Sequence, residues 1–169
     1  MGRPRFAFIL ILRSENHTMT TMFSTSQAPR PVGLYPHSRK IGPWIYLSGI
    51  GPRKPDTEAS ALDVPGLELD ASGRYKAFDF EAQVRQVFEN VRAVLAQHGA
   101  DLEHLVNVTV YLTDMKRDFL AFNRLYAEIL GPLEPKPCRT TVEVGALPTE
   151  IVVELQCVAY LDSIEAGAE

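Results

Sequence analysis

Two charged side chains stand at unexpected positions in the last third of the chain. Arg139 opens an otherwise apolar segment, and Glu154 lies between Val153 and Leu155 in another. Because buried charge is costly unless it is paired or used, both residues need a partner or a function. An arginine holds a carboxylate through two parallel hydrogen bonds, and a glutamate in a partly apolar pocket has a raised pKa that suits acid–base catalysis. Together they would suit the addition of water beside a carboxylate group.

The pattern alone leaves a structural interpretation of this pair open. Arg139 and Glu154 would also fit a salt bridge across a hairpin, or two exposed positions on an edge strand. The residue types are therefore consistent with catalysis but do not by themselves require it.

Patterns for other kinds of chemistry are missing from the sequence. The turn at residues 49–52 follows a predicted strand but runs into proline, so it is no phosphate-binding loop, and no Gly-x-Ser-x-Gly elbow occurs. The four histidines have no metal-ligand spacing, and Cys138 and Cys157 form no Cys-x-x-Cys pair. We therefore expect no metal and no organic cofactor. Whether Cys138 is reactive or merely small and half-buried stays open.

The composition is that of one soluble globular domain. The chain has 169 residues, 46% of them hydrophobic and 22% charged, and is long enough to bury a core. The net charge of −4 and the isoelectric point near 5.6 argue against binding of nucleic acid by phosphate neutralisation. Two thiols without a disulfide framework fit a reducing compartment. We expect a cytoplasmic protein with neither nucleic acid nor a membrane as its partner.

The N-terminus resembles a signal peptide only superficially. Two arginines precede an apolar run of seven residues at 6–12, which is too short to span a bilayer and precedes no small-residue cleavage pattern. Met19 and Met22 offer alternative starts. We expect residues 1–28 to be a disordered N-terminal extension, 29–163 a single domain and 164–169 a C-terminal tail.

The spacing of apolar residues predicts two helices packed on a sheet. Between Phe80 and Leu95 apolar residues recur at the helical period, with Asp79 placed to cap the start and Gly99 the end. A second helix is predicted over 118–130. Strands are predicted over 44–47, 66–70, 105–112, 139–144 and 151–160, the last two as hairpin partners. This order suits an α+β structure with the helices on one sheet face.

The uncovered sheet face is expected to be partly apolar as well. Depending on register, it would carry residues such as Val142, Val144, Val153 and Leu155. Such a face needs a second cover, and self-association is the simplest one.

Several ordered motifs are similar to those of the RidA (YjgF/YER057c/UK114) family. The main one spans residues 137–148 and continues at 153–155; earlier ones lie at 33–36, 46–49, 90–91, 108–112 and 122–126. Together they cover roughly residues 33–161. A narrower resemblance, to the 2-aminomuconate deaminases of that family, lies at 35–37, 53–56, 70–73 and 139–141.

This resemblance implies a chorismate-mutase-like α+β fold, with a mixed sheet covered on one face by two helices. It also implies a homotrimer with active clefts between subunits. Arg139 would bind the substrate carboxylate and Glu154 would position or activate water. The pocket would be lined by Tyr35, Ser48, Gly49, Asn123 and Thr141.

The basic residues of the loops would set the length of the substrate. His37, Arg53 or Lys54 would meet the second carboxylate of a six-carbon dicarboxylate; solvated loop charge is the alternative interpretation. Two positions depart from many imine deaminases of the family: Ile50 stands where they have glutamine, and Thr141 where they have cysteine. Both departures argue against a general housekeeping specificity.

The resemblance therefore implies a hydrolytic, cofactor-free deaminase that converts an enamine or imine, 2-aminomuconate first, to a 2-oxo acid and ammonia. Two alternatives are a general 2-iminobutanoate/2-iminopropanoate deaminase and a non-catalytic trimeric protein that binds a small acid. A ribonuclease activity is disfavoured by the acidic balance of the chain.

Overall fold

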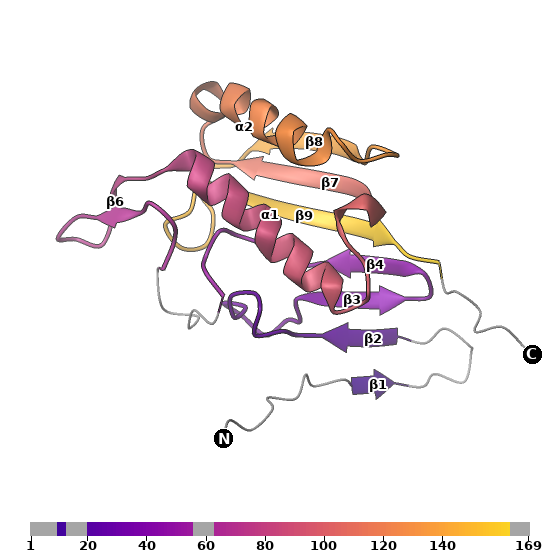
Figure 1. The fold of residues 1–169 in the computed structure, drawn as a ribbon. Helices are drawn as coiled ribbons and strands as arrows, with labels where there is room; N and C mark the ends of the chain where they lie inside the picture. Colours follow the sequence, from indigo (N-terminus) through magenta and orange to yellow (C-terminus); the bar gives the residue numbers. More distant parts are fainter. Residues whose placement is uncertain (1–9, 13–19, 56–62, 163–169) are drawn as a thin grey trace, which may run out of the picture.

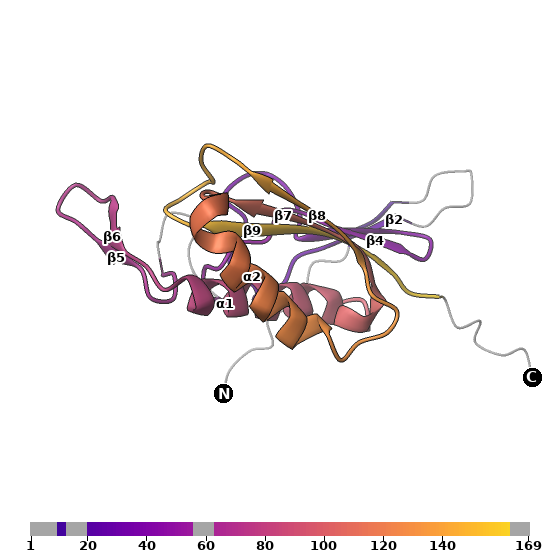
Figure 2. The same cartoon turned by 90° about the horizontal axis from the view of Figure 1, so that it is seen from above.

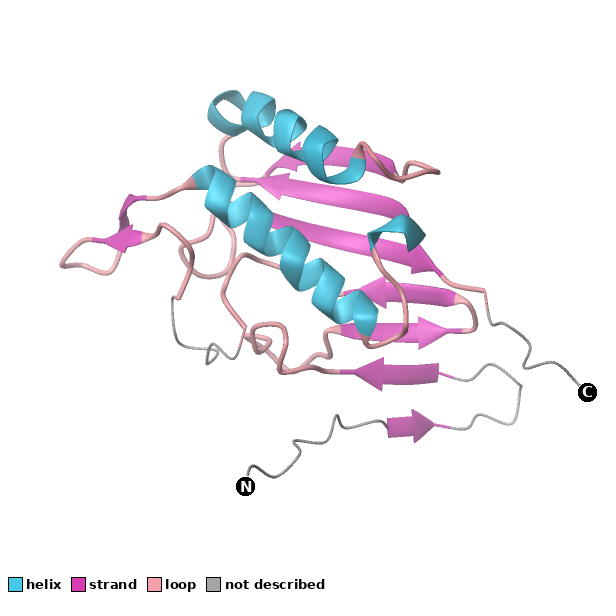
Figure 3. Cartoon of the chain, viewed as in Figure 1, coloured by secondary structure: helices cyan, strands magenta, loops and turns pink. Residues whose placement is uncertain are grey.

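The computed structural model describes residues 10–12, 20–55 and 63–162. These residues form one main sheet, two long helices, a short 3₁₀ helix and a small hairpin (Figures 1 and 3). In chain order the elements are β1 (Leu10–Leu12), β2 (Thr20–Phe23), β3 (Ser38–Ile41), β4 (Trp44–Leu47), β5 (Glu68–Leu69), β6 (Tyr75–Ala77), α1 (Phe80–Ala96), η1 (Leu102–His104), β7 (Leu105–Leu112), α2 (Met115–Leu130), β8 (Cys138–Glu143) and β9 (Val153–Tyr160).

The main sheet has the strand order β1-β2-β3-β4-β9-β7-β8. Only β7 and β8 run parallel; the other neighbours are antiparallel. Both helices lie on the same face of this mixed sheet, and the β5–β6 hairpin stands away from the body (Figure 2). The predicted α+β architecture with two helices on one face is thus confirmed.

The two helices begin where acidic side chains cap them. Asp79 accepts a hydrogen bond from the backbone N–H of Ala82 (2.9 Å), and Asp114 does the same for Arg117 (2.9 Å), each satisfying a backbone donor that the first turn leaves unpaired. The second helix therefore begins three residues before the predicted 118. After α1, Gly99 adopts a positive φ of 74°, a conformation that glycine adopts without strain.

The core lies between the helices and the sheet. The apolar stripe of α1 packs against alternate residues of β4, β7 and β9, as its helical period predicts. An exposed bidentate ion pair joins the helices, with Arg85 donating to Glu128 at 2.8 and 3.0 Å. Among the described residues, no helix is long and apolar enough to cross a membrane.

The predicted hairpin between the last two strands is wrong. β7 lies between β8 and β9 and pairs with both. The alternation of apolar residues was enough to identify each strand but not its neighbour, because period-two patterns define a face and not a partner. The register also turns Val153 and Leu155 toward the helices, where both are fully buried.

Aromatic residues dominate the uncovered face instead. Trp44 pairs with Tyr160 across β4 and β9, with ring centroids 5.0 Å apart, and Tyr46 pairs with Val158. All three rings are at least a third exposed. Val142, opposite Tyr111, also lies on this face, as predicted. The apolar character predicted for the face is therefore present, but it does not come from Val153 and Leu155.

The N-terminal segment differs from the expected disordered extension. β2 pairs with β3 over four residues, and β1 pairs with β2. Pairing at the edge explains this: β3 has an open row of backbone donors and acceptors that a short strand rich in threonine can meet. Residues 1–9 and 13–19 of that extension and the whole predicted tail, 164–169, lie outside the described residues.

Candidate active site

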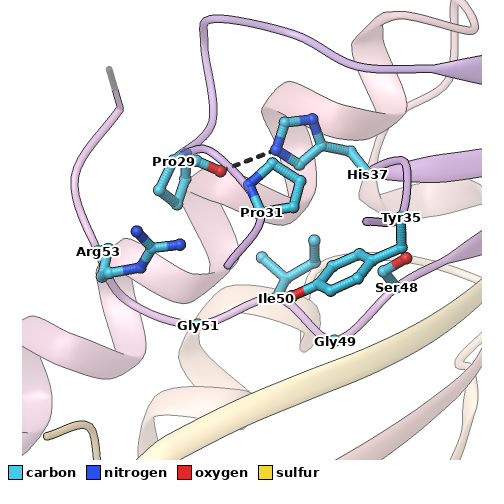
Figure 4. A pocket seen from close by; sticks show the side chains of 9 residues that line it. All are labelled: Pro29, Pro31, Tyr35, His37, Ser48, Gly49, Ile50, Gly51 and Arg53. Carbon is cyan, nitrogen blue, oxygen red and sulfur yellow. Dashed lines mark hydrogen bonds between the residues drawn. The ribbon is translucent and has the colours of Figure 1, made fainter. Parts of the chain in front are cut away.

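The segment that leaves β4 forms one half of the candidate site. Ile50 exchanges two backbone hydrogen bonds with Leu155 of β9 (2.8 and 3.0 Å), so residues 48–53 run along the end of the sheet. The hydroxyl of Ser48 donates to the carbonyl of Pro36 (2.7 Å), which holds the preceding loop beside it. A pocket forms between these segments (Figure 4), lined by Pro29, Pro31, Tyr35, His37, Ser48, Gly49, Ile50, Gly51 and Arg53.

Helix α1 fixes this pocket from beneath through a buried amide. The side-chain N–H₂ of Asn90 donates to the carbonyls of Gly51 (2.9 Å) and Arg53 (2.8 Å). Its side-chain oxygen accepts from Gln86 (3.0 Å). Asn90 is fully buried, so it satisfies two loop carbonyls that water does not reach. A polar residue inside an apolar helical stripe was the sequence signal for this role, and it was missed.

Glu154 lies next to the turn at Gly49. A Cβ atom added to Gly49 would stand 2.4 Å from Oε1 of Glu154, so only glycine fits there without displacing the carboxylate. Burial raises the pKa of Glu154 above its usual value. Within the described part of the chain, no cation pairs with this carboxylate and no donor hydrogen-bonds to it. Glu154 is therefore poised to take up and release a proton.

His37 has a structural place in the pocket wall. Its Nδ1 accepts from the backbone N–H of Thr25 (3.1 Å), and its Nε2 lies 2.8 Å from the carbonyl of Pro29, to which it donates (Figure 4). Burial lowers the pKa of His37, although the bond to Pro29 opposes this shift. The neutral ring uses both nitrogens to hold residues 25–29, and neither nitrogen is left to donate to a substrate.

Arg53 is the buried cation of this pocket. Only 7% of the residue is exposed, one N–H₂ group donates to the carbonyl of Arg30, and burial lowers its pKa. The neighbouring Lys54 points elsewhere and pairs with Asp63 at 2.8 Å. The free space in the pocket is about 30 Å³, room for roughly one water molecule. A six-carbon acid would therefore have to extend beyond it.

Arg139 belongs to the other half of the candidate site, on the edge strand β8. Its register partner Val108 faces the helices, so its side chain lies on the helix side of the sheet. The guanidinium carbon is 4.7 Å from the ring centroid of Tyr126 and 5.9 Å from that of Phe122, both on α2. Among the described residues, no carboxylate pairs with Arg139.

Two further predicted site residues lie on the same two elements, β8 and α2. Thr141 follows Arg139 two residues later on the same strand face, and its hydroxyl is buried without a hydrogen-bond partner among the described residues. Asn123 is half-buried on α2, next to Phe122 in the sequence. The helix that carries the aromatic pair under Arg139 was predicted, but the contact of the pair with the arginine depends on the register of β8.

The two halves of the predicted site do not meet within one chain. Glu154 pairs with Tyr111 on the uncovered face, whereas Arg139 pairs with Val108 on the helix face. Strand β7 separates β9 from β8, a span of about 10 Å at the usual strand spacing, and the three positions from Val108 to Tyr111 add about 10 Å along the strands. The salt bridge that the sequence left open is therefore absent from the described residues. A single chain cannot place Arg139 and Glu154 on one small substrate.

Comparison with known proteins gives consistent matches over nearly the whole described chain. The profile of the family described as Endoribonuclease L-PSP matches residues 25–161. A RutC family protein of Pyrococcus abyssi is 36% identical over 136 residues, 80% of this chain and 93% of its own length. Reactive Intermediate Deaminase A of Arabidopsis thaliana is 30% identical over 158 residues, 94% of this chain and 74% of its own.

Solved structures agree with the sequence matches. The crystal structure of RidA from an Antarctic Psychrobacter superposes with a TM-score of 0.66 at 35% identity, covering 82% of this chain and 97% of that one. The resemblance in sequence and the resemblance in fold therefore point to the same group of proteins.

Proposed function

Because the chain belongs to the Endoribonuclease L-PSP family, which includes the RutC and RidA proteins, we propose that it is a hydrolytic deaminase of enamine or imine amino acids. The products would be a 2-oxo acid and ammonia. The relative named Reactive Intermediate Deaminase A supports this reaction class. The net charge of −4 weighs against the ribonuclease that the family description names.

The observation that carries this proposal is the environment of Arg139. Its guanidinium rests over the aromatic rings of α2, and in the described chain no acidic side chain neutralises it. An arginine whose N–H edge is free binds a carboxylate with two parallel hydrogen bonds. This fits a substrate that carries a carboxylate next to its reacting carbon.

Glu154 would supply the proton transfers. The enamine first tautomerises to the imine, which is electrophilic without help from a cofactor. Glu154 accepts a proton from water as the water oxygen bonds to the imine carbon, and the nitrogen takes up a proton. The carbinolamine then collapses: the hydroxyl proton passes through Glu154 to the nitrogen, the C–N bond breaks, ammonia leaves, and the carbon keeps the oxygen as a ketone. A raised carboxylate pKa suits a group that both accepts and returns a proton.

We further propose that the working site lies at a seam between two copies, in a homotrimer. The support is geometric: Arg139 and Glu154 lie on opposite sheet faces of one chain, and the face that carries Glu154 also has the exposed rings of Trp44, Tyr46 and Tyr160. An aromatic face of this kind is typical of a surface that another protein covers. One copy would contribute Arg139, and the neighbouring copy would contribute Glu154.

Within this reaction class we propose 2-aminomuconate as the substrate. The buried Arg53 offers a second cation in the pocket that contains Ser48 and Gly49, which suits an acid with a second carboxylate. His37 would act indirectly, by holding the loop. A general 2-iminobutanoate/2-iminopropanoate deaminase, or a trimeric protein that only binds small acids, would use the same Arg139 without Arg53.

Ammonia release tests these proposals together. We expect ammonia from 2-aminomuconate, and kcat/KM about 100-fold or more lower in Arg139→Ala, because a charge-assisted bidentate contact is lost. Unchanged rates in Arg139→Ala would contradict the catalytic assignment. A protein that binds 2-oxo acids but releases no ammonia from any enamine or imine would favour the binding protein.

A paired set of variants tests the length of the acid. Arg53→Ala should lower turnover of 2-aminomuconate about tenfold or more, while leaving that of short imines generated by an amino-acid oxidase nearly unchanged. Lys54→Ala is the matched control, because Lys54 pairs with Asp63 outside the pocket. Equal losses on both substrates in Arg53→Ala would contradict the dicarboxylate assignment.

A further inference from the structure

The aromatic rings beneath Arg139 have a role that the reaction scheme leaves unassigned. We propose that Tyr126 is a positioning residue: its ring holds the guanidinium of Arg139 at the edge of the sheet with the N–H groups free for a carboxylate. This inference rests on the proposed function, since it concerns the carboxylate grip of the same site. It names a residue that acts through Arg139 and not on the substrate.

The first support is the distance between the cation and the ring. The guanidinium carbon lies 4.7 Å from the ring centroid of Tyr126 and 5.9 Å from that of Phe122. Both values fall within the range of about 6 Å in which an aromatic face attracts a cation. Tyr126 is the closer ring and follows Phe122 by one helical turn, so the two rings form a continuous surface on α2.

The second support is that the ring of Tyr126 is itself held in place. It packs against Phe122 with centroids 5.8 Å apart and against Phe88 of α1 at 6.1 Å. Phe88 and Phe122 are both at most 1% exposed. A ring fixed on two sides by core residues is a rigid support for a long, flexible side chain.

The third support is that nothing else in the described chain orients Arg139. The arginine has no hydrogen bond or ion pair there, and β8 is the last strand of the sheet. Stacking occupies the flat face of a guanidinium and leaves its N–H edge unused. Ordering the side chain before the ligand arrives reduces the entropy that binding must overcome.

The hydroxyl of Tyr126 takes no part in this arrangement. It is buried and has no hydrogen-bond partner among the described residues. Burial raises the pKa of Tyr126, although the nearby Arg139 opposes this, so the ring stays neutral under ordinary conditions. The ring, and not the hydroxyl, is therefore the functional part of Tyr126, and phenylalanine at this position should keep the function.

Steady-state kinetics give the first test. Tyr126→Leu should raise KM for the enamine, and the inhibition constant of 2-oxobutanoate, roughly three- to tenfold, with kcat within about twofold of wild type. Tyr126→Phe should behave as wild type, and so should Phe119→Leu, a half-buried aromatic on the same helix without a cation–π contact to Arg139. A loss in kcat alone, or an equal loss in Tyr126→Phe, would overturn the proposal.

A spectroscopic test does not depend on turnover. In the wild-type protein the side-chain protons of Arg139 should show ring-current displacement in NMR spectra, retained in Tyr126→Phe and lost in Tyr126→Leu. Undisplaced Arg139 protons in the wild type would overturn the inference even where the leucine variant fails to fold. Displaced protons in a protein that releases no ammonia would instead reject the proposed function and leave the positioning of Arg139 standing.

Discussion

The two halves of the candidate site are built in different ways. The loop half has Gly49 in a loop beside Glu154 of β9, and hydrogen bonds from the backbone of Ile50 and from the side chains of Ser48 and Asn90 fix it. The half that contains Arg139 is made of a strand and a helix, and stacking on α2 fixes it. The loop half positions a proton acceptor within tight steric limits, whereas the strand half displays a cation at an open edge. Neither half is complete alone.

The largest expected effect comes from separating and recombining the halves. Arg139→Ala and Glu154→Gln should each be nearly inactive, with kcat/KM about 100-fold or more below wild type. Coexpressed in equal amounts, they should regain about a quarter of the wild-type rate, because about one seam in four would pair an intact arginine with an intact glutamate. The measurement is ammonia release by the purified mixture.

Failure to regain activity on mixing would be the contrary result. It would mean that both residues serve the same chain, or that one of them has no role. Coexpression of each variant with itself is the control for assembly.

A smaller effect should follow from crowding the loop half. Gly49→Ala places a Cβ atom 2.4 Å from Oε1 of Glu154, which is too close for both atoms, so the carboxylate must move. We expect kcat to fall about 10- to 100-fold, as for other misplaced catalytic groups, with less change in KM because Arg139 is untouched. Gly145→Ala is the matched control, since an added Cβ there meets nothing within 4 Å. Equal rates in the two variants would show that Glu154 does not need its present position.

The smallest expected effect is on stability and its dependence on pH. Burial raises the pKa of Glu154 in the folded chain, so the folded state binds this proton more tightly than the unfolded state does. The stability contributed by Glu154 is therefore present below its ordinary pKa and is lost as the pH rises through the raised value. Glu154→Gln should have a higher Tm than wild type at neutral pH and a similar one near pH 4, measured by calorimetry. A lower Tm at neutral pH would contradict an unpaired, partly buried carboxylate.

The sequence was sufficient for the elements and insufficient for their neighbours. Strands 44–47 and 105–112 were predicted with the bounds that the structure has, and α1 followed from its apolar period. Alternation also identified the last two strands, β8 and β9. It could not show that β7 lies between them in the sheet, because strand pairing depends on contacts between residues far apart in the sequence. The separation of Arg139 from Glu154 depends on that insertion. Asn90 was hidden for another reason: its two hydrogen bonds go to a loop far away in the sequence.

The uncovered sheet face also has an optical consequence. Trp44 is the only tryptophan of the chain; it lies on this face, 38% exposed, against the ring of Tyr160. The tryptophan fluorescence of the protein therefore comes from the surface that we propose to be covered by another copy. Emission should shift to longer wavelength when the protein is diluted until the copies separate, because water then reaches the indole. Trp44 is thus an intrinsic fluorescent probe of assembly, and no added label is needed.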